Sequence, residues 1–219
     1  MRNTSYARSA TATGLLVAMI LQVTTSCTSF QTEPEGASPE LTTSFAHASN
    51  RIGPFAIDTV TAAPLQIVAM AYVELPPEDV FDLTVTGLGT WVTQVQEVEF
   101  DHTRSATPGQ MGVGSLRSST FDGSRLQERI VHWDPPRSYA FRILVEESEA
   151  DLPITDHMGL FLVEPRDGGS LLTWRQYFEP NSGLRGYLVT GFLKDSMMRA
   201  ALNRLAQQHG GTLVTPTGN

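Results

Sequence analysis

The sequence lacks several features that mark common classes of protein. Its 219 residues include one cysteine, Cys27, so no disulfide can form within the chain. The formal net charge is −8 and no run of Lys and Arg occurs, which argues against a nucleic-acid partner because phosphate binding needs concentrated positive charge. The apolar run from Gly14 to Leu21 is shorter than the roughly 20 residues of a membrane-spanning helix. Apolar residues nevertheless make up 41% of the chain, which is enough for a globular core.

Established catalytic and metal-binding signatures are missing as well. The chain has no Gly-x-Ser-x-Gly, no His-Glu-x-x-His and no glycine-rich phosphate loop. None of the five histidines is paired at helical ligand spacing; they are His47, His102, His132, His157 and His209. We therefore expect no metal and no cofactor, and motifs alone identify no catalytic residue.

The N-terminus has the pattern of an export signal. A polar lead with Arg2 and Arg8 precedes the apolar run, and the small residues Thr24 to Ser26 follow it. Cys27 comes next, at a position that resembles a bacterial lipobox, in which it would become the lipidated first residue of the mature chain. The alternative is an ordinary signal peptide that is cut elsewhere. We predict a protein of the cell envelope that is anchored through Cys27 to the periplasmic or extracytoplasmic face of a membrane.

Composition divides the chain into four parts. They are a signal peptide (1–26), a lipid-anchored flexible tether and lead-in (27–63), a folded domain (64–211) and a tail (212–219). Residues 28–50 are rich in Ser, Thr, Pro, Glu and Ala without sustained periodicity, which is typical of a flexible segment. Residues 51–63 contain apolar side chains and could add an edge strand or an ordered lead-in.

Seven segments of the folded domain have strand patterns. They are Leu65–Leu75, Val92–Asp101, Gly112–Phe121, Ser124–Asp134, Arg137–Glu146, Ile154–Pro165 and Ser170–Pro180. Turn signals such as Asp122-Gly123 and Asp167-Gly168-Gly169 separate them. Because the loops are mostly short, the strands are expected to pair antiparallel.

Two helices complete the predicted fold. A short one follows the first strand, with Pro76 or Pro77 in its first turn and the acidic Glu78 and Asp79 at its positive end. A long one near the C-terminus ends at Gly210-Gly211. One helix, about 10–12 Å wide, cannot cover the apolar face of a flat seven-stranded sheet. We predict an α+β fold in which a curved antiparallel sheet surrounds the long helix, a space remains between them, and the short helix closes one end.

This order resembles the helix-grip superfamily of START-like (SRPBCC) proteins, polyketide cyclases and Bet v 1-like plant allergens. The segments that carry the resemblance are VELPPEDVFDL (Val73–Leu83), Trp91, GVGSLR (Gly112–Arg117), ERIVHWDPPRSYAF (Glu128–Phe141), GGSLLTWRQYFEP (Gly168–Pro180) and the final helix. The likeness covers about Pro64 to His209 and is greatest to the polyketide cyclase/dehydrase and lipid-transport branch. It implies a cavity for a hydrophobic molecule but no shared catalytic motif.

Strand alternation predicts the wall of this cavity. The residues assigned to it are Glu128, Ile130, His132, Tyr139, Phe141, Ile143, Leu172, Trp174, Gln176 and Phe178, with Phe192 and Met197 from the helix. Plain core packing is the alternative for the aromatic residues, and either core packing or exposure to solvent is the alternative for Met197. An inward Glu128 needs a polar partner such as Arg117.

Glu128 and His132 allow two interpretations. They either anchor a ligand or transfer protons as an acid–base pair, and the structural alternative for Glu128 is an ion pair or a place at the rim. Asp156-His157 is a second and weaker candidate pair.

Three functions follow from these observations. The first is an exported, lipid-anchored protein that binds a lipid-like or polycyclic hydrophobic molecule. The second is a cyclase- or dehydrase-type enzyme that uses Glu128 and His132. The third is a ligand-free envelope interaction domain with a filled core. Export and the missing catalytic cluster favour binding over catalysis.

Overall fold

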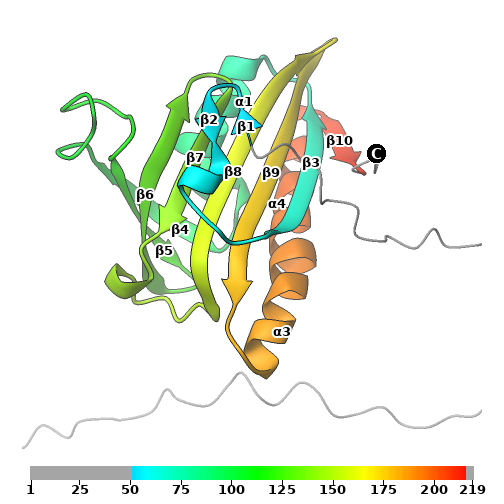
Figure 1. Cartoon of the computed structure of the whole chain (residues 1–219). Coiled ribbons are helices and arrows are strands. Elements are labelled where there is room, and N and C mark those ends of the chain that lie inside the picture. The colour runs from blue at the N-terminus through cyan, green and yellow to red at the C-terminus, as the bar shows by residue number, and fades with distance from the viewer. Residues whose placement is uncertain (1–50, 216–219) are drawn as a thin grey trace, which may run out of the picture. The chain divides into compact units, whose positions relative to one another are not determined.

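The computed structural model describes residues 51–215. The predicted signal peptide, Cys27 and the tether up to residue 50 lie outside the described residues. The main element is one antiparallel sheet in the order β10-β3-β9-β8-β7-β6-β5-β4 (Figure 1). Its strands are β3 (Leu65–Val73), β4 (Val95–Asp101), β5 (Leu116–Phe121), β6 (Ser124–Asp134), β7 (Ser138–Ile143), β8 (Ile154–Arg166), β9 (Gly169–Pro180) and β10 (Gly211–Val214). A 3-10 turn, η3 (Val145–Glu147), follows β7.

The sheet has eight strands, so the expected count of seven was one too low. The additional strand is β10, which pairs antiparallel with β3 and includes residues that we expected in the tail. Gly210 and Gly211 reverse the chain after the helix, with φ of 76° and 119°. A Cβ on Gly211 would lie 2.0 Å from the carbonyl oxygen of Tyr72, so only glycine allows this close approach.

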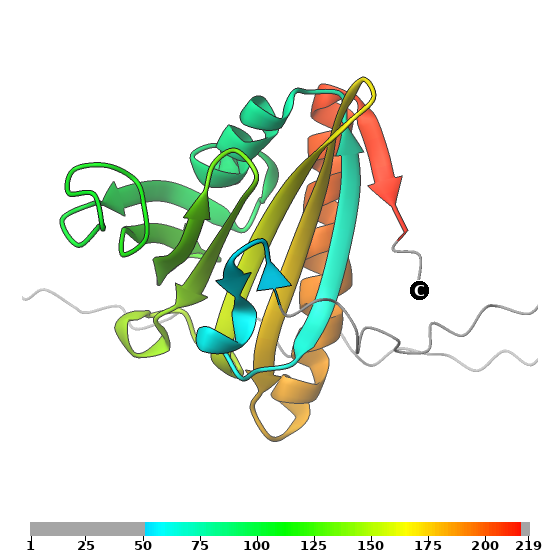
Figure 2. The same ribbon diagram turned by 45° about the horizontal axis from the view of Figure 1, so that its top comes forward.

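The two predicted helices lie where the sequence placed them. α1 (Pro77–Val85) has proline at its first turn, with Glu78 and Asp79 beside it. The short helix α2 (Leu88–Trp91), which follows it, was not predicted. The C-terminal helix is continuous and has three parts, which are α3 (Leu184–Gly191), the π-helix η4 (Phe192–Arg199) and α4 (Ala200–His209). It lies along one face of the curved sheet (Figure 2). Within residues 51–215, no helix has the length and apolar character needed to cross a membrane.

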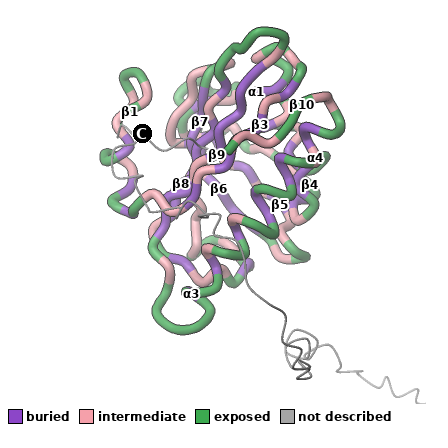
Figure 3. The backbone as a smooth tube through the Cα atoms, turned by 90° about the vertical axis from the view of Figure 1, so that its right-hand side faces the viewer, coloured by how far each residue is buried: buried purple, intermediate pink, exposed green. Residues whose placement is uncertain are grey.

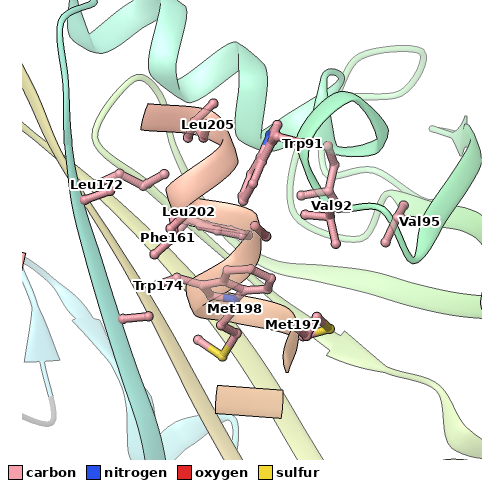
Figure 4. Close-up of a cluster of buried hydrophobic side chains, with 14 of the residues drawn as sticks. Trp91, Val92, Val95, Phe161, Leu172, Trp174, Met197, Met198, Leu202 and Leu205 are labelled. Carbon is pink, nitrogen blue, oxygen red and sulfur yellow. The ribbon is translucent and has the colours of Figure 1, made fainter. Parts of the chain in front are cut away.

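The main core fills the space between the sheet and the C-terminal helix. Trp91 is fully buried there, and its ring packs edge-on against Phe161 and Trp174 at centroid distances of 6.2 and 5.8 Å. Figure 4 shows Leu202, Leu205 and Met198 of the helix meeting this aromatic group. These side chains hold α4 firmly on the sheet.

A smaller core covers the opposite face of the sheet. The hairpin β1 (Arg51–Ile52) and β2 (Phe55–Ala56) and the turn η2 (Ile57–Thr59) lie on that face (Figure 1). Ile57 packs with Met158 and Tyr177 in this second cluster. The lead-in that precedes β3 is therefore ordered against the sheet, as a hairpin and not as an edge strand.

Candidate functional site

A cavity of about 70 Å³ lies between the concave face of the sheet and the α3–η4 part of the helix. Most of its wall is apolar, with contributions from α2, β4 to β9 and the helix side chains of Val189, Leu193 and Met197. The polar side chains on the wall are those of Arg117, Glu128, His157 and Gln176, together with the indole of Trp174.

Half of the twelve residues that we assigned to the cavity lie on its wall. They are Glu128, Phe141, Ile143, Trp174, Gln176 and Met197. Four others are buried in the same core without lining the cavity, namely Ile130, Tyr139, Leu172 and Phe178. Phe192 is 43% exposed and faces outward, so its assignment to the wall was wrong.

His132 was also assigned to the wrong face. A β-bulge between Ile130 and His132 interrupts the pairing of β6 with β7. One extra residue at a bulge reverses the alternation that follows it. His132 therefore stacks on Phe55 of the outer hairpin, at 4.2 Å between ring centroids, and Trp133 takes the inward position against Tyr139. The predicted acid–base pair of Glu128 and His132 does not form.

His157 is a cavity residue that our assignment left out. It lies on the inward face of β8 in regular alternation with Phe161, and a second bulge, between Thr155 and His157, precedes it. Its neighbour Asp156 stays outside, where it accepts hydrogen bonds from Arg142 at 2.8 Å and from Thr61 at 2.8 Å. The candidate pair Asp156-His157 is thus divided between the two faces of the sheet. Alternation counted back from Phe161 along the predicted strand would have placed His157 on the inward face.

A buried ion pair forms the polar floor of the cavity. Arg117, which is 1% exposed, donates from Nε to Oε2 of Glu128 at 2.6 Å and from Nη1 to the hydroxyl of Tyr139 at 3.3 Å. The Tyr139 hydroxyl in turn donates to the carbonyl oxygen of Thr84 in α1. The expected partner of Glu128 is therefore confirmed, and the network connects the cavity to α1.

The charges of this floor balance each other. Burial disfavours the charged guanidinium, but Glu128 and Tyr139 outweigh burial, so the pKa of Arg117 is raised. The guanidinium also lies over the ring of Phe141, with its central carbon 4.7 Å from the ring centroid. Arg117 and Glu128 together carry no net charge, so the cavity is electrically neutral around them.

His157 is neutral at physiological pH. Burial lowers its pKa to about 4, and the hydrogen bond to Gln176 and the nearby Asp156 only partly oppose this effect. Its Nε2 donates to Oε1 of Gln176. The remaining ring nitrogen, Nδ1, is therefore a hydrogen-bond acceptor.

Three residues that line the cavity each carry a buried polar atom that has no hydrogen-bond partner within the described part of the chain. The atoms are Arg117 Nη2, Trp174 Nε1 and His157 Nδ1. The first two are donors and the third is an acceptor. Leaving such an atom unpaired costs about 1–3 kcal/mol, so each of the three calls for a partner such as a ligand or water. The residues around one mostly apolar cavity thus carry two unpaired donors and one unpaired acceptor.

Gly159 of β8 makes room for the ring of Phe141. The two residues are paired across β7 and β8, and a Cβ on Gly159 would lie 2.2 Å from Cζ of Phe141. Any larger residue at position 159 would displace this ring. The position of Phe141 on the wall therefore depends on glycine, which has no side chain, at position 159.

A second hollow of about 550 Å³ lies beside α1. Phe81 and Trp133 form part of its lining, and Glu78 and Asp82 contribute carboxylates. None of the buried unpaired polar atoms belongs to it. Within residues 51–215, no three acidic, histidine or cysteine side chains gather as a metal site would require.

The match to a known family agrees with this architecture. The family described as "Polyketide cyclase / dehydrase and lipid transport" matches residues 64–210. The chain belongs to this family. Its helix-grip fold provides the space between sheet and helix that the cavity occupies. No curated protein matches the chain.

Solved structures with this fold are distant in sequence. A Thermobifida fusca protein is 24% identical over 66% of this chain and 92% of its own, with a TM-score of 0.50. The protein XoxI of Bacillus cereus is 21% identical over 65% and 94%, with a TM-score of 0.49. The major latex-like protein 151 of Panax ginseng is 15% identical over 66% and 96%, with a TM-score of 0.46. At these identities, the likeness to the Thermobifida fusca structure supports the fold alone.

Proposed function

We propose that this chain is an exported, lipid-anchored binding protein that holds a hydrophobic small molecule between its sheet and its C-terminal helix. The family and the fold support a hydrophobic ligand. The observation that carries the proposal is an apolar cavity whose lining residues include three with an unpaired buried polar atom. A molecule with an apolar body and a few polar atoms would satisfy both parts of this wall.

The polar part of the ligand is neutral. Arg117 is already paired with Glu128, so a ligand carboxylate would add a buried negative charge next to Glu128 without a free counter-ion. A carbonyl oxygen can accept from Arg117 Nη2 or Trp174 Nε1, and a hydroxyl can donate to His157 Nδ1. Affinity then comes mainly from removing apolar area from water, at about 25 cal/mol per Å².

Binding requires the cavity to widen. Its volume of about 70 Å³ is well below that of sites for drug-sized ligands, which span about 300–1,000 Å³. The α3–η4 segment (Leu184–Arg199) supplies one wall and contains the π-helix, a geometry that often marks functional sites. We expect this segment to move outward when a ligand enters.

A matched set of probes tests this function. Naphthalene, 2-acetylnaphthalene and 2-naphthoate share one apolar body and differ in their polar group. Calorimetric titration should give the tightest binding for the neutral ketone, by about tenfold over naphthalene, because one hydrogen bond contributes about 0.5–1.5 kcal/mol. Leu193→Trp should abolish binding because it fills the cavity. Failure of all three probes would sink the proposal.

The ligand-free interaction domain remains the rival function, because the small volume favours it. It predicts that no neutral probe binds and that Leu193→Trp changes nothing but stability. The enzyme that we considered from the sequence loses its acid–base pair, since His132 lies on the outer face.

Export and anchoring rest on the N-terminal signal pattern and on Cys27. If Cys27 is the lipidated first residue, globomycin should retard the protein on a gel and Cys27→Ser should release it from membranes. An unmodified protein cut at another residue would contradict the anchor and leave the binding function intact.

A further inference from the structure

The α3–η4 segment carries an exposed apolar face. Five large apolar side chains are classed as exposed within residues 51–215, and four of them belong to this segment. They are Leu184 (73% exposed), Tyr187 (81%), Leu188 (53%) and Phe192 (43%). Their spacing of i, i+3, i+4 and i+8 places them on one side of the helix. We call these four residues the α3 patch; in Figure 3 the tube at α3 is largely in the colour of exposed residues.

The α3 patch lies on the reverse side of the cavity wall. Val189, Leu193 and Met197 of the same segment are buried and line the cavity. The segment is therefore apolar on both sides, although only the inner side has a partner. A contiguous exposed apolar surface usually marks an interaction site.

We propose that the α3 patch inserts into the interfacial layer of a lipid bilayer. The exposed parts of its four side chains amount to roughly 500 Å², taking about 150–250 Å² for each aromatic side chain. A stable protein–protein interface takes about 800 Å² from each partner, so a second copy of this chain would have to bury the polar surroundings of the patch as well. A bilayer needs no complementary shape, and tyrosine is enriched at its interface.

The charges around the patch are nearly balanced. Arg185 is paired with Asp151 at 2.8 Å, and Arg199 lies 3.9 Å from Asp195, which leaves Lys194 as the basic group of the segment without an ion pair among the described residues. A single Lys near an anionic surface contributes about 1 kcal/mol, so insertion should depend mainly on apolar area and should not require anionic lipid.

The predicted anchor is compatible with this contact. The 23 residues between Cys27 and Arg51 can span up to roughly 80 Å when extended. The domain can therefore place α3 on the membrane that holds Cys27. If the proposed ligand binding also holds, insertion sets the movable wall of the cavity against the bilayer, from which an apolar molecule can enter.

A local fluorescent probe tests the insertion. Cys27→Ser removes the only cysteine and the lipid attachment point, so a single new cysteine can carry an NBD label. Leu188→Cys places the label on the patch, and Val113→Cys is the matched control, because Val113 is an exposed apolar residue (44%) outside the segment. Phosphatidylcholine vesicles should raise the emission at position 188 about threefold with a blue shift, and should leave position 113 unchanged.

Four other outcomes would overturn the insertion. They are no change at position 188, an equal change at both positions, a change that requires anionic lipid, and a change that grows with protein concentration without vesicles. The last would assign the patch to a second copy of the chain. In the labelled Leu188→Cys protein, adding Leu184→Ser and Tyr187→Ser should abolish the response, with an unchanged far-ultraviolet circular dichroism spectrum as the folding control. The naphthalene titrations need no membrane, so the two proposals fail separately.

Discussion

The two halves of the C-terminal helix differ in how they use their apolar residues. α4 buries Ala201, Leu202, Leu205 and Ala206 and exposes no large apolar side chain. The α3–η4 half instead lines a cavity on one side and exposes the α3 patch on the other. The comparison indicates that one end of the helix holds the fold together, while the other end remains available for movement and contact.

The neighbours of each half explain this difference. α4 packs against β3, β10 and α2, and Gln208 donates to the carbonyl oxygen of Thr90. α3 leaves β9 at a turn and reaches the end of the sheet (Figure 1). The polar floor with Arg117 and Glu128 lies on the sheet side of the cavity, and η4 lies on the helix side. Mutations in the three regions should therefore have unequal effects.

The largest effect is expected at the polar floor. Arg117→Leu leaves Glu128 buried without its partner, and breaking such a pair costs about 3–5 kcal/mol. Urea unfolding would measure the loss. The double variant Arg117→Leu/Glu128→Leu should recover most of it, because no lone charge remains. If the double variant is as unstable as the single one, lost packing and not the lone charge is responsible.

Leu202→Ala in the anchored half should cost about 2–5 kcal/mol, because this side chain is fully buried and the surrounding core can collapse only partly. Thermal and urea unfolding would both show the loss. Ligand-probe affinity should stay within a fewfold, since Leu202 does not line the cavity. A large drop in affinity at preserved folding would show that the two halves are not independent.

Stability should also depend on pH through His157. Its pKa is about 4 in the folded chain, against 6.5 for an unperturbed histidine, so the unfolded state binds more protons between these values. Stability should therefore be complete above pH 6.5 and fall by up to about 3 kcal/mol as the pH drops to 4.

His157→Gln provides the control for this pH dependence. It should make the stability profile less steep between pH 6.5 and 4, whatever its effect on stability at pH 7; a smaller slope remains because burial also lowers the pKa of His132. Asp101 and Asp134 have lowered pKa values, so their contributions are lost only below about pH 4. An unchanged slope in the variant would show that His157 is not buried in its neutral form.

The smallest effect is expected at the α3 patch. Leu188→Ala should change stability by less than about 0.5 kcal/mol, because the side chain is already half exposed. Chemical unfolding against wild type would check this. A loss like that of Leu202→Ala would mean that the patch is covered in solution, and the contrast between the two halves would then disappear.

Patterns along the chain predicted the fold well. Alternation and turn residues located seven of the eight strands, and the proline pair located the start of α1. The strand β10 has four residues, too few for a pattern, and depends on the glycine reversal at 210–211. The hairpin before β3 is equally short, and its place on the outer face depends on tertiary packing that the local sequence does not specify.

The site was predicted only in part, for a specific physical reason. Alternation holds along regular strands, and it correctly placed Trp174 and Gln176 on the wall. It fails after the bulge in β6, which moved His132 out, whereas His157 lies in regular alternation with Phe161 and could have been found. The need of a buried carboxylate for a cation did identify Arg117, because that argument depends on charge and not on register.

Gly159 sets how much room the cavity has. Because the Phe141 ring occupies the place of a side chain at this position, one added methyl group would act as a spacer beneath the ring and push it into the cavity. Related chains could therefore favour smaller or larger molecules through a single residue in the middle of β8. The polar floor and the helix would need no change. The size of the bound molecule and its polar chemistry would then be set by different residues.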